Sequence, residues 1–191
     1  MSTKIKICFF NDFFPFSRGG AEYQAYLLAK SLDPERYDVS FVSRGGNSEG
    51  EYHIDGFRIF FLNPLNFYKK FGRPYCLYYN QIKAILKNVR PHIVYQRTGS
   101  AVTGILSRLS SAYGFTFVWA SASDVDLSMH TPSFRILSNI DDILRISGIR
   151  NAETVLAQSL AQQSRLVEKF GRQAIILPNG HPIPEKKMHK D

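Results

Sequence analysis

One unit near the amino terminus limits the folds that are open to this chain. An apolar run over Lys4–Phe10 leads into a loop that ends in Gly19-Gly20, and apolar residues then recur at helical spacing until Asp33-Pro34. A strand with hydrophobic residues on both faces is typical of a parallel sheet that is covered by helices. This strand, glycine loop and helix therefore predict an α/β fold.

The same alternation continues along the chain. Further strands are predicted at 37–43, 52–62 (a hairpin around Asp55-Gly56), 92–96, 115–120, 154–157 and 174–177, with helical patterns in 75–89, 102–109, 134–149 and 160–170. The pattern predicts a doubly wound, Rossmann-like domain with a mostly parallel sheet and the hairpin near one edge. We expect residues 1–178 to form this domain and residues 179–191, which lack periodicity, to be an interdomain linker or a tail.

The charge of the chain favours an anionic partner. Lys and Arg number 24 against 16 Asp and Glu, which gives a formal charge of +8. A nucleotide, a phospholipid surface and a nucleic acid would all satisfy this preference. No nucleic-acid recognition signature accompanies the charge, so we do not expect a nucleic-acid partner.

Cysteine and histidine usage bears on compartment and cofactor. Cys8 and Cys76 lie in apolar or aromatic surroundings, which suits buried free thiols in a reducing compartment. No apolar run approaches the ~20 residues that a membrane span needs, and the start lacks a signal-peptide core. The histidines show no metal-ligand spacing. We therefore expect a cytoplasmic protein with no bound metal and no cofactor.

In such folds the ligand lies beyond the carboxyl ends of the strands, which nominates the loops 11–20, 43–50, 96–99 and 121–126. Gly19-Gly20 opens a helix, whose free N–H groups and positive dipole end attract anions. The alternative is a tight helix-start turn without a ligand. No Gly-x-Gly-x-x-Gly follows the first strand, which disfavours a nicotinamide or flavin enzyme.

Charged and polar residues of these loops are candidate ligand contacts. Arg18 and Arg97 could each grip phosphate or acceptor oxygens with a guanidinium, although both could also be solvated surface residues. Gln96, Thr98 and Glu22 share the expected cleft as partners of sugar hydroxyls. Glu22 could instead only stabilise the helix terminus.

Several segments resemble, in order, the amino-terminal half of GT-B glycosyltransferases of the large retaining class called family four. The matching pieces are Phe13-Phe14-Pro15 with Gly19-Gly20-Ala21-Glu22, Leu28–Leu32 leading into Tyr37-Asp38-Val39, Asn151–Ser159, and Ile175–Gly180. Together they extend over nearly the whole chain, from Lys4 to Pro184.

The resemblance implies transfer of a sugar from a nucleotide-sugar donor to a saccharide or lipid-linked acceptor, as in polysaccharide biosynthesis. Family members carry a second α/β domain that binds most of the donor and has two glutamates eight positions apart. No glutamate of this chain has another eight positions on. We therefore expect an isolated acceptor-side domain that is nearly inactive without its carboxyl-terminal partner domain.

The resemblance also assigns roles to residues. Gly19, Gly20 and Arg18 would meet the donor diphosphate, and Asn179-Gly180 would be the hinge to the second domain. Many members place a sugar-contacting histidine after the strand that ends here at Ala120. This chain has Ser123 and Asp124 there as substitutes able to bind sugar hydroxyls. The donor's own phosphate assists in this class, so no catalytic residue is assigned.

The segment Phe67–Arg73 leaves a second function open. It mixes aromatic and basic side chains, which could place this face on an anionic membrane at the inner side of the cell. The plainer interpretation is a core-facing stripe with a solvated basic rim. The alternative to an enzyme domain is thus a non-catalytic membrane- or partner-binding module with a Rossmann-like fold.

Overall fold

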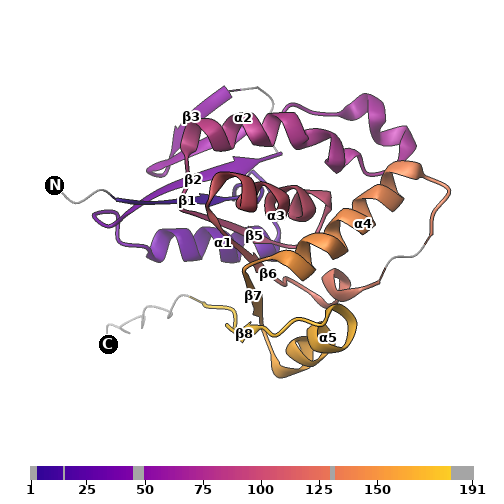
Figure 1. Ribbon diagram of the computed structural model, residues 1–191. Coiled ribbons are helices and arrows are strands. Elements are labelled where there is room, and N and C mark those ends of the chain that lie inside the picture. Colours follow the sequence, from indigo (N-terminus) through magenta and orange to yellow (C-terminus); the bar gives the residue numbers. More distant parts are fainter. Residues whose placement is uncertain (1–3, 15, 45–49, 130–131, 182–191) are drawn as a thin grey trace, which may run out of the picture.

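The computed structural model describes residues 4–14, 16–44, 50–129 and 132–181. Within these residues the chain forms an eight-stranded sheet in the order β3-β4-β2-β1-β5-β6-β7-β8 (Figure 1). The strands are β1 Ile5–Phe9, β2 Tyr37–Ser43, β3 Gly50–Ile54, β4 Phe57–Phe61, β5 Ile93–Arg97, β6 Thr116–Ala120, β7 Thr154–Ala157 and β8 Ile175–Ile176. The hairpin β3–β4 is antiparallel and the other neighbouring strands are parallel. This confirms the predicted Rossmann-like α/β fold, with the hairpin at one edge.

Helices cover both faces of the sheet (Figure 1). They are α1 Gly20–Ser31, α2 Tyr79–Val89, α3 Ala101–Tyr113, α4 Ile136–Asn151 and α5 Leu160–Phe170, with short 3-10 helices η1 Asn66–Phe71, η2 Pro74–Tyr78 and η3 Asp124–Leu127. Alternate residues of β1 serve the two cores: Ile7 and Phe9 pack in the core beside α1, and Cys8 packs in the core beside α2 and α3. A strand that is apolar on both faces is therefore buried on both faces, as its sequence predicts.

Local backbone signals set several element ends. Arg90 has a left-handed backbone (φ 47°) and ends α2 just before Pro91. Gly171 also has a left-handed backbone (φ 65°) and ends α5, as predicted. Strand β8 is shorter than the predicted 174–177, and its two residues are exposed. The segment between β4 and α2 contains η1 and η2, and the segment between β6 and α4 contains η3.

Helices α3 and α4 make the closest helix contact on their face of the sheet. A Cβ atom on Gly148 of α4 would overlap the backbone of Thr103 and Gly104 of α3, and one on Gly104 would overlap the carbonyl of Leu144. Side chains cannot fit between backbones at this distance, so the crossing requires glycine on both helices. The contact holds α4 over the carboxyl end of the sheet.

We predict that Gly148→Ala lowers the free energy of unfolding by about 2 kcal/mol, because the added methyl group must push the two backbones apart. Urea denaturation measures this change. Gly20→Ala is the matched control: a Cβ there meets nothing within 4 Å. We expect that control to be neutral or to stabilise by up to about 1 kcal/mol. An equal effect of both substitutions would contradict the importance of the crossing.

Candidate functional site

A pocket of about 260 Å³ opens where the carboxyl ends of β1, β2 and β5 meet. It contains the point where the strand order reverses, between β1 and β5, which is where doubly wound sheets bind ligands. We call it the polar pocket. Its lining residues are Phe10, Asn11, Asp12, Glu22, Val42, Arg44, Leu62, Arg73, Tyr75, Gln96, Thr98, Gly99, Ser100 and Val102.

The floor between β1 and β5 is closed by one side chain. Asn11 is buried; its Nδ2 donates to the Arg97 carbonyl (2.9 Å), and its Oδ1 accepts from the Arg97 backbone N–H (3.0 Å). The side-chain amide thus makes the pair of bonds that a backbone peptide would make in a sheet. Asn11 therefore holds the two strand ends together beneath the pocket.

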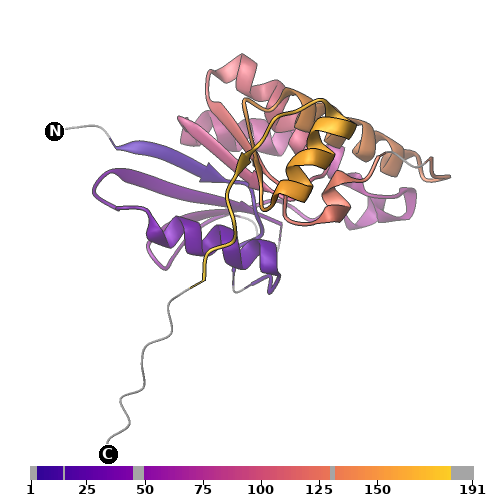
Figure 2. The same ribbon diagram turned by 90° about the horizontal axis from the view of Figure 1, so that it is seen from below.

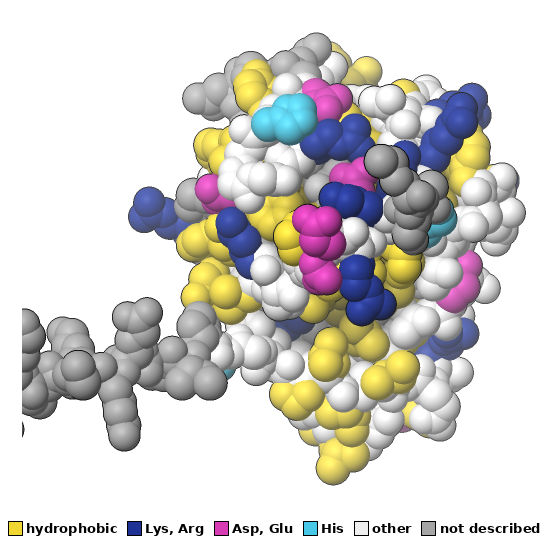
Figure 3. All heavy atoms as spheres, turned by 90° about the vertical axis from the view of Figure 1, so that its left-hand side faces the viewer, with side chains coloured by type: hydrophobic (Ala, Val, Ile, Leu, Met, Phe, Trp, Pro, Cys, Tyr) yellow, Lys and Arg dark blue, Asp and Glu magenta, His cyan; other side chains and the backbone are white. Residues whose placement is uncertain are grey.

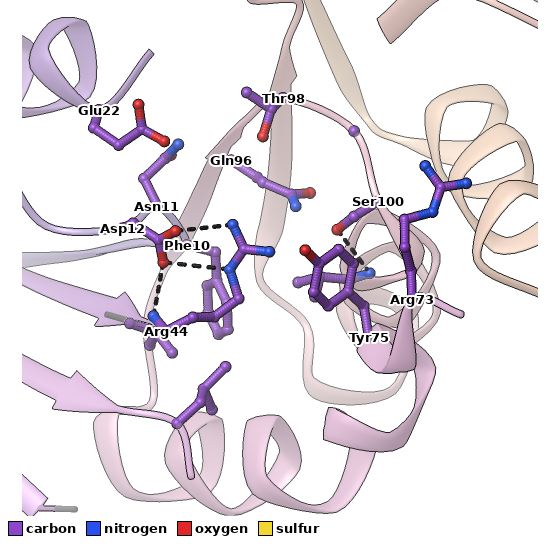
Figure 4. A pocket seen from close by; sticks show the side chains of 14 residues that line it. Phe10, Asn11, Asp12, Glu22, Arg44, Arg73, Tyr75, Gln96, Thr98 and Ser100 are labelled. Carbon is purple, nitrogen blue, oxygen red and sulfur yellow. Dashed lines mark hydrogen bonds and ion pairs between the residues drawn. The ribbon is translucent and has the colours of Figure 1, made fainter. Parts of the chain in front are cut away.

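Arg44 is held within the pocket by an acidic partner and an aromatic ring. Its Nη2 lies 2.9 Å from Asp12 Oδ2, its Nε lies 3.3 Å from Asp12 Oδ1, and its guanidinium lies 4.7 Å from the centre of the Tyr75 ring. Burial lowers the pKa of Arg44, but the Asp12 carboxylate more than offsets this, so the pKa is raised overall. The guanidinium is therefore charged and fixed in place, beside Gln96 and Tyr75 (Figure 4).

Gln96 presents an unused hydrogen-bond acceptor to this space. Its side chain is 3% exposed, and its Oε1 has no hydrogen-bond partner in the part of the chain that the structure describes. A buried polar atom without a partner costs about 1–3 kcal/mol, so such atoms are uncommon unless a ligand or water completes them. Gln96 is accordingly suited to accept a hydrogen bond from a ligand hydroxyl.

Thr98 adopts a backbone conformation that is unfavourable for its type. Its φ is 76°, a left-handed value that β-branched residues rarely take. Two bonds hold it there: its N–H donates to the Ala120 carbonyl (3.1 Å), and its carbonyl accepts from Trp119 Nε1 (2.9 Å). Backbone strain of this kind gathers at ligand sites, and Thr98 lies in the pocket wall.

One buried carboxylate joins the loops that follow β5 and β6. Asp126 accepts from the backbone N–H of Gly99 (2.9 Å), and its other oxygen accepts from the N–H groups of Ala122 (2.8 Å) and Ser123 (3.1 Å). Arg145 of α4 donates to the Asp126 carbonyl (2.7 Å). Asp126 is therefore a clamp that fixes the relative position of the two loops.

A second hollow of about 520 Å³ lies next to the polar pocket, at the start of α1. We call it the α1 hollow. It shares Glu22 and Thr98 with the polar pocket, and its lining residues are Gly20, Ala21, Glu22, Tyr23, Gln24, Arg97, Thr98, Ala122, Ser123, Asn179 and His181.

The chain after β8 closes one side of the α1 hollow. It runs beside α1 (Figure 2), where Gln24 Nε2 donates to the Gly180 carbonyl (2.8 Å). Arg97 is 7% exposed, and its Nη2 donates to Asn179 Oδ1 (2.6 Å). Of the two predicted hinge residues, Asn179 thus contacts the predicted ligand residue Arg97, and Gly180 contacts Gln24.

Most of the predicted site residues come together. Gly20, Glu22, Arg97, Thr98, Ser123 and Asn179 line the α1 hollow, Gln96 lines the polar pocket, and Gly180 lines an adjoining hollow that also contains Arg97.

Three of the predicted site residues do not line the polar pocket, the α1 hollow or the adjoining hollow. Gly19 is the N-cap of α1, and the Glu22 carboxylate lies directly over it. Arg18 is exposed and is outside the lining of both hollows. The Asp124 carboxylate forms an ion pair with Arg165 of α5, which directs it away from the α1 hollow.

Sequence reasoning missed four charged or aromatic residues of the polar pocket, namely Asp12, Arg44, Arg73 and Tyr75. A usable signal existed for the first two, because each lies in a loop that follows a strand whose carboxyl end was expected at the site. Arg73 and Tyr75 follow no strand, and only the fold of η2 brings them to the pocket.

The cysteines are not suited to nucleophilic chemistry. Burial raises the pKa of Cys8 to about 12, so its thiol is protonated at neutral pH. Cys76 is a free thiol too, but it is half-buried rather than buried as expected. Among the described residues, no group of three or more His, Cys, Asp or Glu side chains could hold a metal ion. No described helix is both long and apolar enough to cross a bilayer.

The polar pocket combines hydrogen-bonding and apolar groups. The Arg44 guanidinium is a donor, Gln96 Oε1 is an acceptor, and apolar side chains such as Leu62 and Val102 form part of the wall. The neighbouring α1 hollow adds a helix N-terminus and the Arg97 guanidinium, which favour an anionic group. The two sites are contiguous, so a polar group and an anionic group could be held at once.

Comparison with known proteins gives a family and a fold. A family model described as Glycosyltransferase Family 4 matches residues 18–183. A search of curated protein sequences found no match. Among solved structures, the chain is similar to sucrose-phosphate synthase from Thermosynechococcus elongatus, with a TM-score of 0.67 and 14% identity over 93% of this chain and 49% of that one.

Two epimerase structures are also similar. A UDP-N-acetylglucosamine 2-epimerase has a TM-score of 0.56 and 10% identity over 93% of this chain and 49% of that one. The UDP-GlcNAc 2-epimerase from Methanocaldococcus jannaschii has a TM-score of 0.50 and 10% identity over 92% of this chain and 46% of that one. The chain thus spans about half the length of these proteins, and the likeness is one of fold.

We predict that Asp126→Asn loosens both loops, because an amide in place of the carboxylate cannot accept from all three backbone N–H groups. Amide exchange at Gly99, Ala122 and Ser123 should become faster, with a loss of about 1–3 kcal/mol in the free energy of unfolding. Asp124→Asn is the matched control, since it removes only an exposed ion pair, worth less than about 1 kcal/mol. Equal exchange rates in the two variants would contradict the role of Asp126 in fixing the two loops.

Proposed function

Because the chain belongs to glycosyltransferase family 4, we propose that it is the acceptor-side domain of an enzyme that transfers a sugar from a nucleotide-sugar to a saccharide or lipid-linked acceptor. The observation that carries this proposal is the unpartnered, buried Gln96 Oε1 in a sugar-sized pocket beside the start of α1. A pocket for a hydroxyl-bearing acceptor next to a hollow for an anionic donor is what glycosyl transfer requires. We further propose that the anomeric configuration is retained.

The acceptor would occupy the polar pocket. One of its hydroxyls would donate to Gln96 Oε1, and another would accept from the Arg44 guanidinium, whose orientation Asp12 fixes. The Tyr75 ring would pack against the sugar. A saccharide carries adjacent hydroxyls that act as both donor and acceptor, so it suits this pair of groups.

The donor diphosphate would lie in the α1 hollow. Gly20 at the start of α1 and the Arg97 guanidinium would bind its oxygens, and Arg18 at the end of the same loop is free to approach. The Glu22 carboxylate lies over Gly19, so it would have to turn away before a phosphate approaches that glycine. Turning toward the polar pocket would bring Glu22 to an acceptor hydroxyl.

Two further residues would assist at the transferred sugar. Ser123 lines the α1 hollow and could hydrogen-bond a sugar hydroxyl there. Asp124 could do so only after it leaves Arg165. The donor phosphate itself would receive the acceptor proton, as the class resemblance implies, so we assign no catalytic side chain. We propose no metal and no cofactor.

The proposal includes a second domain. The chain spans about half of the GT-B-like structures to which it is similar, and the paired glutamates of the family do not occur in it. A carboxyl-terminal domain would hold most of the nucleotide-sugar, with Asn179-Gly180 as the hinge between the two domains. The amino-terminal domain described here would be nearly inactive without it. The free cysteines support a cytoplasmic location. A non-catalytic membrane- or partner-binding module remains the competing proposal.

The test uses this chain joined to a GT-B carboxyl-terminal domain and assayed for transfer from nucleotide-sugars. We predict that Gln96→Leu, which keeps the size of the side chain, lowers kcat/KM by about tenfold or more, since a lost hydrogen bond to a ligand is worth about 1.4 kcal/mol. The loss should appear mainly as a higher KM for the acceptor. Arg97→Ala should lower kcat/KM as well, through the donor.

Lys87→Ala is the control, because Lys87 lies in the last turn of α2, at the opposite end of the sheet. We expect that variant to transfer at the rate of the unchanged protein. Transfer that survives both Gln96→Leu and Arg97→Ala would contradict the site assignment. No transfer with any nucleotide-sugar would favour the non-catalytic module.

A further inference from the structure

The first ten residues of helix α4 have charged side chains on the buried face and isoleucines on the outer face. Its buried face contains Asp141 (1% exposed) and Arg145 (4% exposed), whereas Ile136 (70%) and Ile143 (58%) are on the opposite, outer face together with Ile140. An ordinary surface helix buries its isoleucines and exposes its charges. The outer face of α4 is therefore an apolar stripe without cover among the described residues.

The buried charges fix this orientation. Asp141 Oδ1 accepts from the Ala101 N–H at the start of α3 (2.9 Å), and Arg145 donates to the carbonyls of Asp126 (2.7 Å) and Ser128 (2.8 Å). A rotation of α4 that buried the isoleucines would break all three bonds and leave the partner groups unsatisfied. The exposed stripe is thus a fixed feature of the fold.

A second group of exposed apolar side chains adjoins α4. Phe67, Tyr68 and Phe71 of η1 are exposed, so the interpretation of this segment as a core-facing stripe is wrong. Next to η1, Gly72 packs against Arg135 and Ser138, which places η1 at the start of α4. Phe134, just before α4, is fully exposed. Aromatic and aliphatic side chains therefore project from both elements in one region.

The exposed charged side chains among these apolar groups are basic. Arg135, the N-cap of α4, is exposed, whereas the nearby Asp142 is half-buried and paired with Arg73 and Arg145. Lys69 and Lys70 of η1 are exposed, and the Lys70 Nζ lies over the rings of Phe67 (4.4 Å) and Phe71 (5.0 Å). By contrast, the face at the amino-terminal ends of the strands shows basic and acidic side chains interspersed (Figure 3).

We propose that this region is a docking face for an anionic phospholipid bilayer. We call it the membrane face; it consists of Phe67, Phe71, Phe134, Ile136, Ile140 and Ile143 with the basic residues Lys69, Lys70 and Arg135. An apolar helix face with aromatic and basic neighbours is suited to the bilayer interface, where rings insert and lysines meet lipid phosphates. A second copy fits less well, because two such basic rims would repel each other.

The membrane face also bears on the acceptor of the proposed transfer reaction, and this step of the inference rests on the proposed function. η2 follows η1 closely in the chain. Arg73, the N-cap of η2, and Tyr75 of η2 line the polar pocket. A bilayer at η1 would therefore place the acceptor pocket close to the lipid surface. The class of acceptor that this arrangement suits is a glycan attached to a membrane lipid, rather than a free saccharide.

Vesicle co-sedimentation of the 191-residue chain tests the docking face. At low salt we expect binding to vesicles of 30% phosphatidylglycerol in phosphatidylcholine, weaker binding at high salt, and little binding to pure phosphatidylcholine. Ile140→Ser with Ile143→Ser should weaken binding by about tenfold or more, and Lys69→Glu with Lys70→Glu by about twentyfold or more.

Matched controls carry the same chemical changes elsewhere. Val167→Ser removes an exposed apolar side chain from α5, and Lys4→Glu with Lys87→Glu makes the same change in charge at the amino-terminal end of the sheet. We expect both controls to bind like the unchanged chain. Because Trp119 is fully buried, a Phe67→Trp variant adds a surface fluorophore whose emission should shift to the blue on anionic vesicles.

Three results would overturn the docking face. They are no sedimentation with anionic vesicles at low salt, equal binding by the membrane-face and control variants, and loss of vesicle binding when a GT-B carboxyl-terminal domain is joined to the chain. A concentration-dependent dimer that the isoleucine substitutions abolish, without vesicle binding, would assign the face to a second copy. Vesicle binding does not depend on sugar transfer, so the two proposals can fail separately. If only the proposed function is wrong, the protein binds vesicles but transfers no sugar.

Discussion

The buried hydrogen-bond network of Asp126 and Arg145 is the interaction on which both the two hollows and the outer face of α4 depend. On one side it fixes the loops after β5 and β6 through the Asp126 carboxylate. On the other side it anchors α4 through the Arg145 guanidinium. A buried charge is costly unless hydrogen bonds satisfy it, and here backbone N–H groups satisfy the Asp126 carboxylate while backbone carbonyls satisfy the Arg145 guanidinium. The same buried network therefore determines both which face of α4 is buried and the shape of the polar pocket.

The two hollows are contiguous because they share part of a wall. Glu22 comes from the helix that follows β1, and Thr98 comes from the loop that follows β5, so each side chain borders both spaces. The reversal of strand order between β1 and β5 creates this crevice, and the side chains at its rim come from opposite faces of the sheet. An acceptor and a donor bound there would be separated by little more than one residue.

Much of the fold could be predicted from the sequence because its signals are local. The bounds of β2, β7 and α5 follow from apolar spacing and from breakers such as Gly171. The orientation of α4 could not be predicted, because helical spacing of isoleucines does not reveal that the opposite face carries paired charges. Part of the candidate site could be predicted: the rule on strand ends nominated loops that line the two hollows, but the Asp12–Arg44 pair joins two loops 32 residues apart. Such long-range pairs depend on the assembled sheet.

The Asn11 amide has a consequence for the order in which the domain is built. Its bonds to Arg97 span 86 positions of the chain, so they close a long loop that cannot form while only the first unit has folded. During synthesis β1 and α1 can associate early, but the floor of the polar pocket waits until β5 has been made. The last wall of the α1 hollow, at Asn179, arrives later still. A ligand therefore meets a complete site only after nearly all of the described chain has left the ribosome.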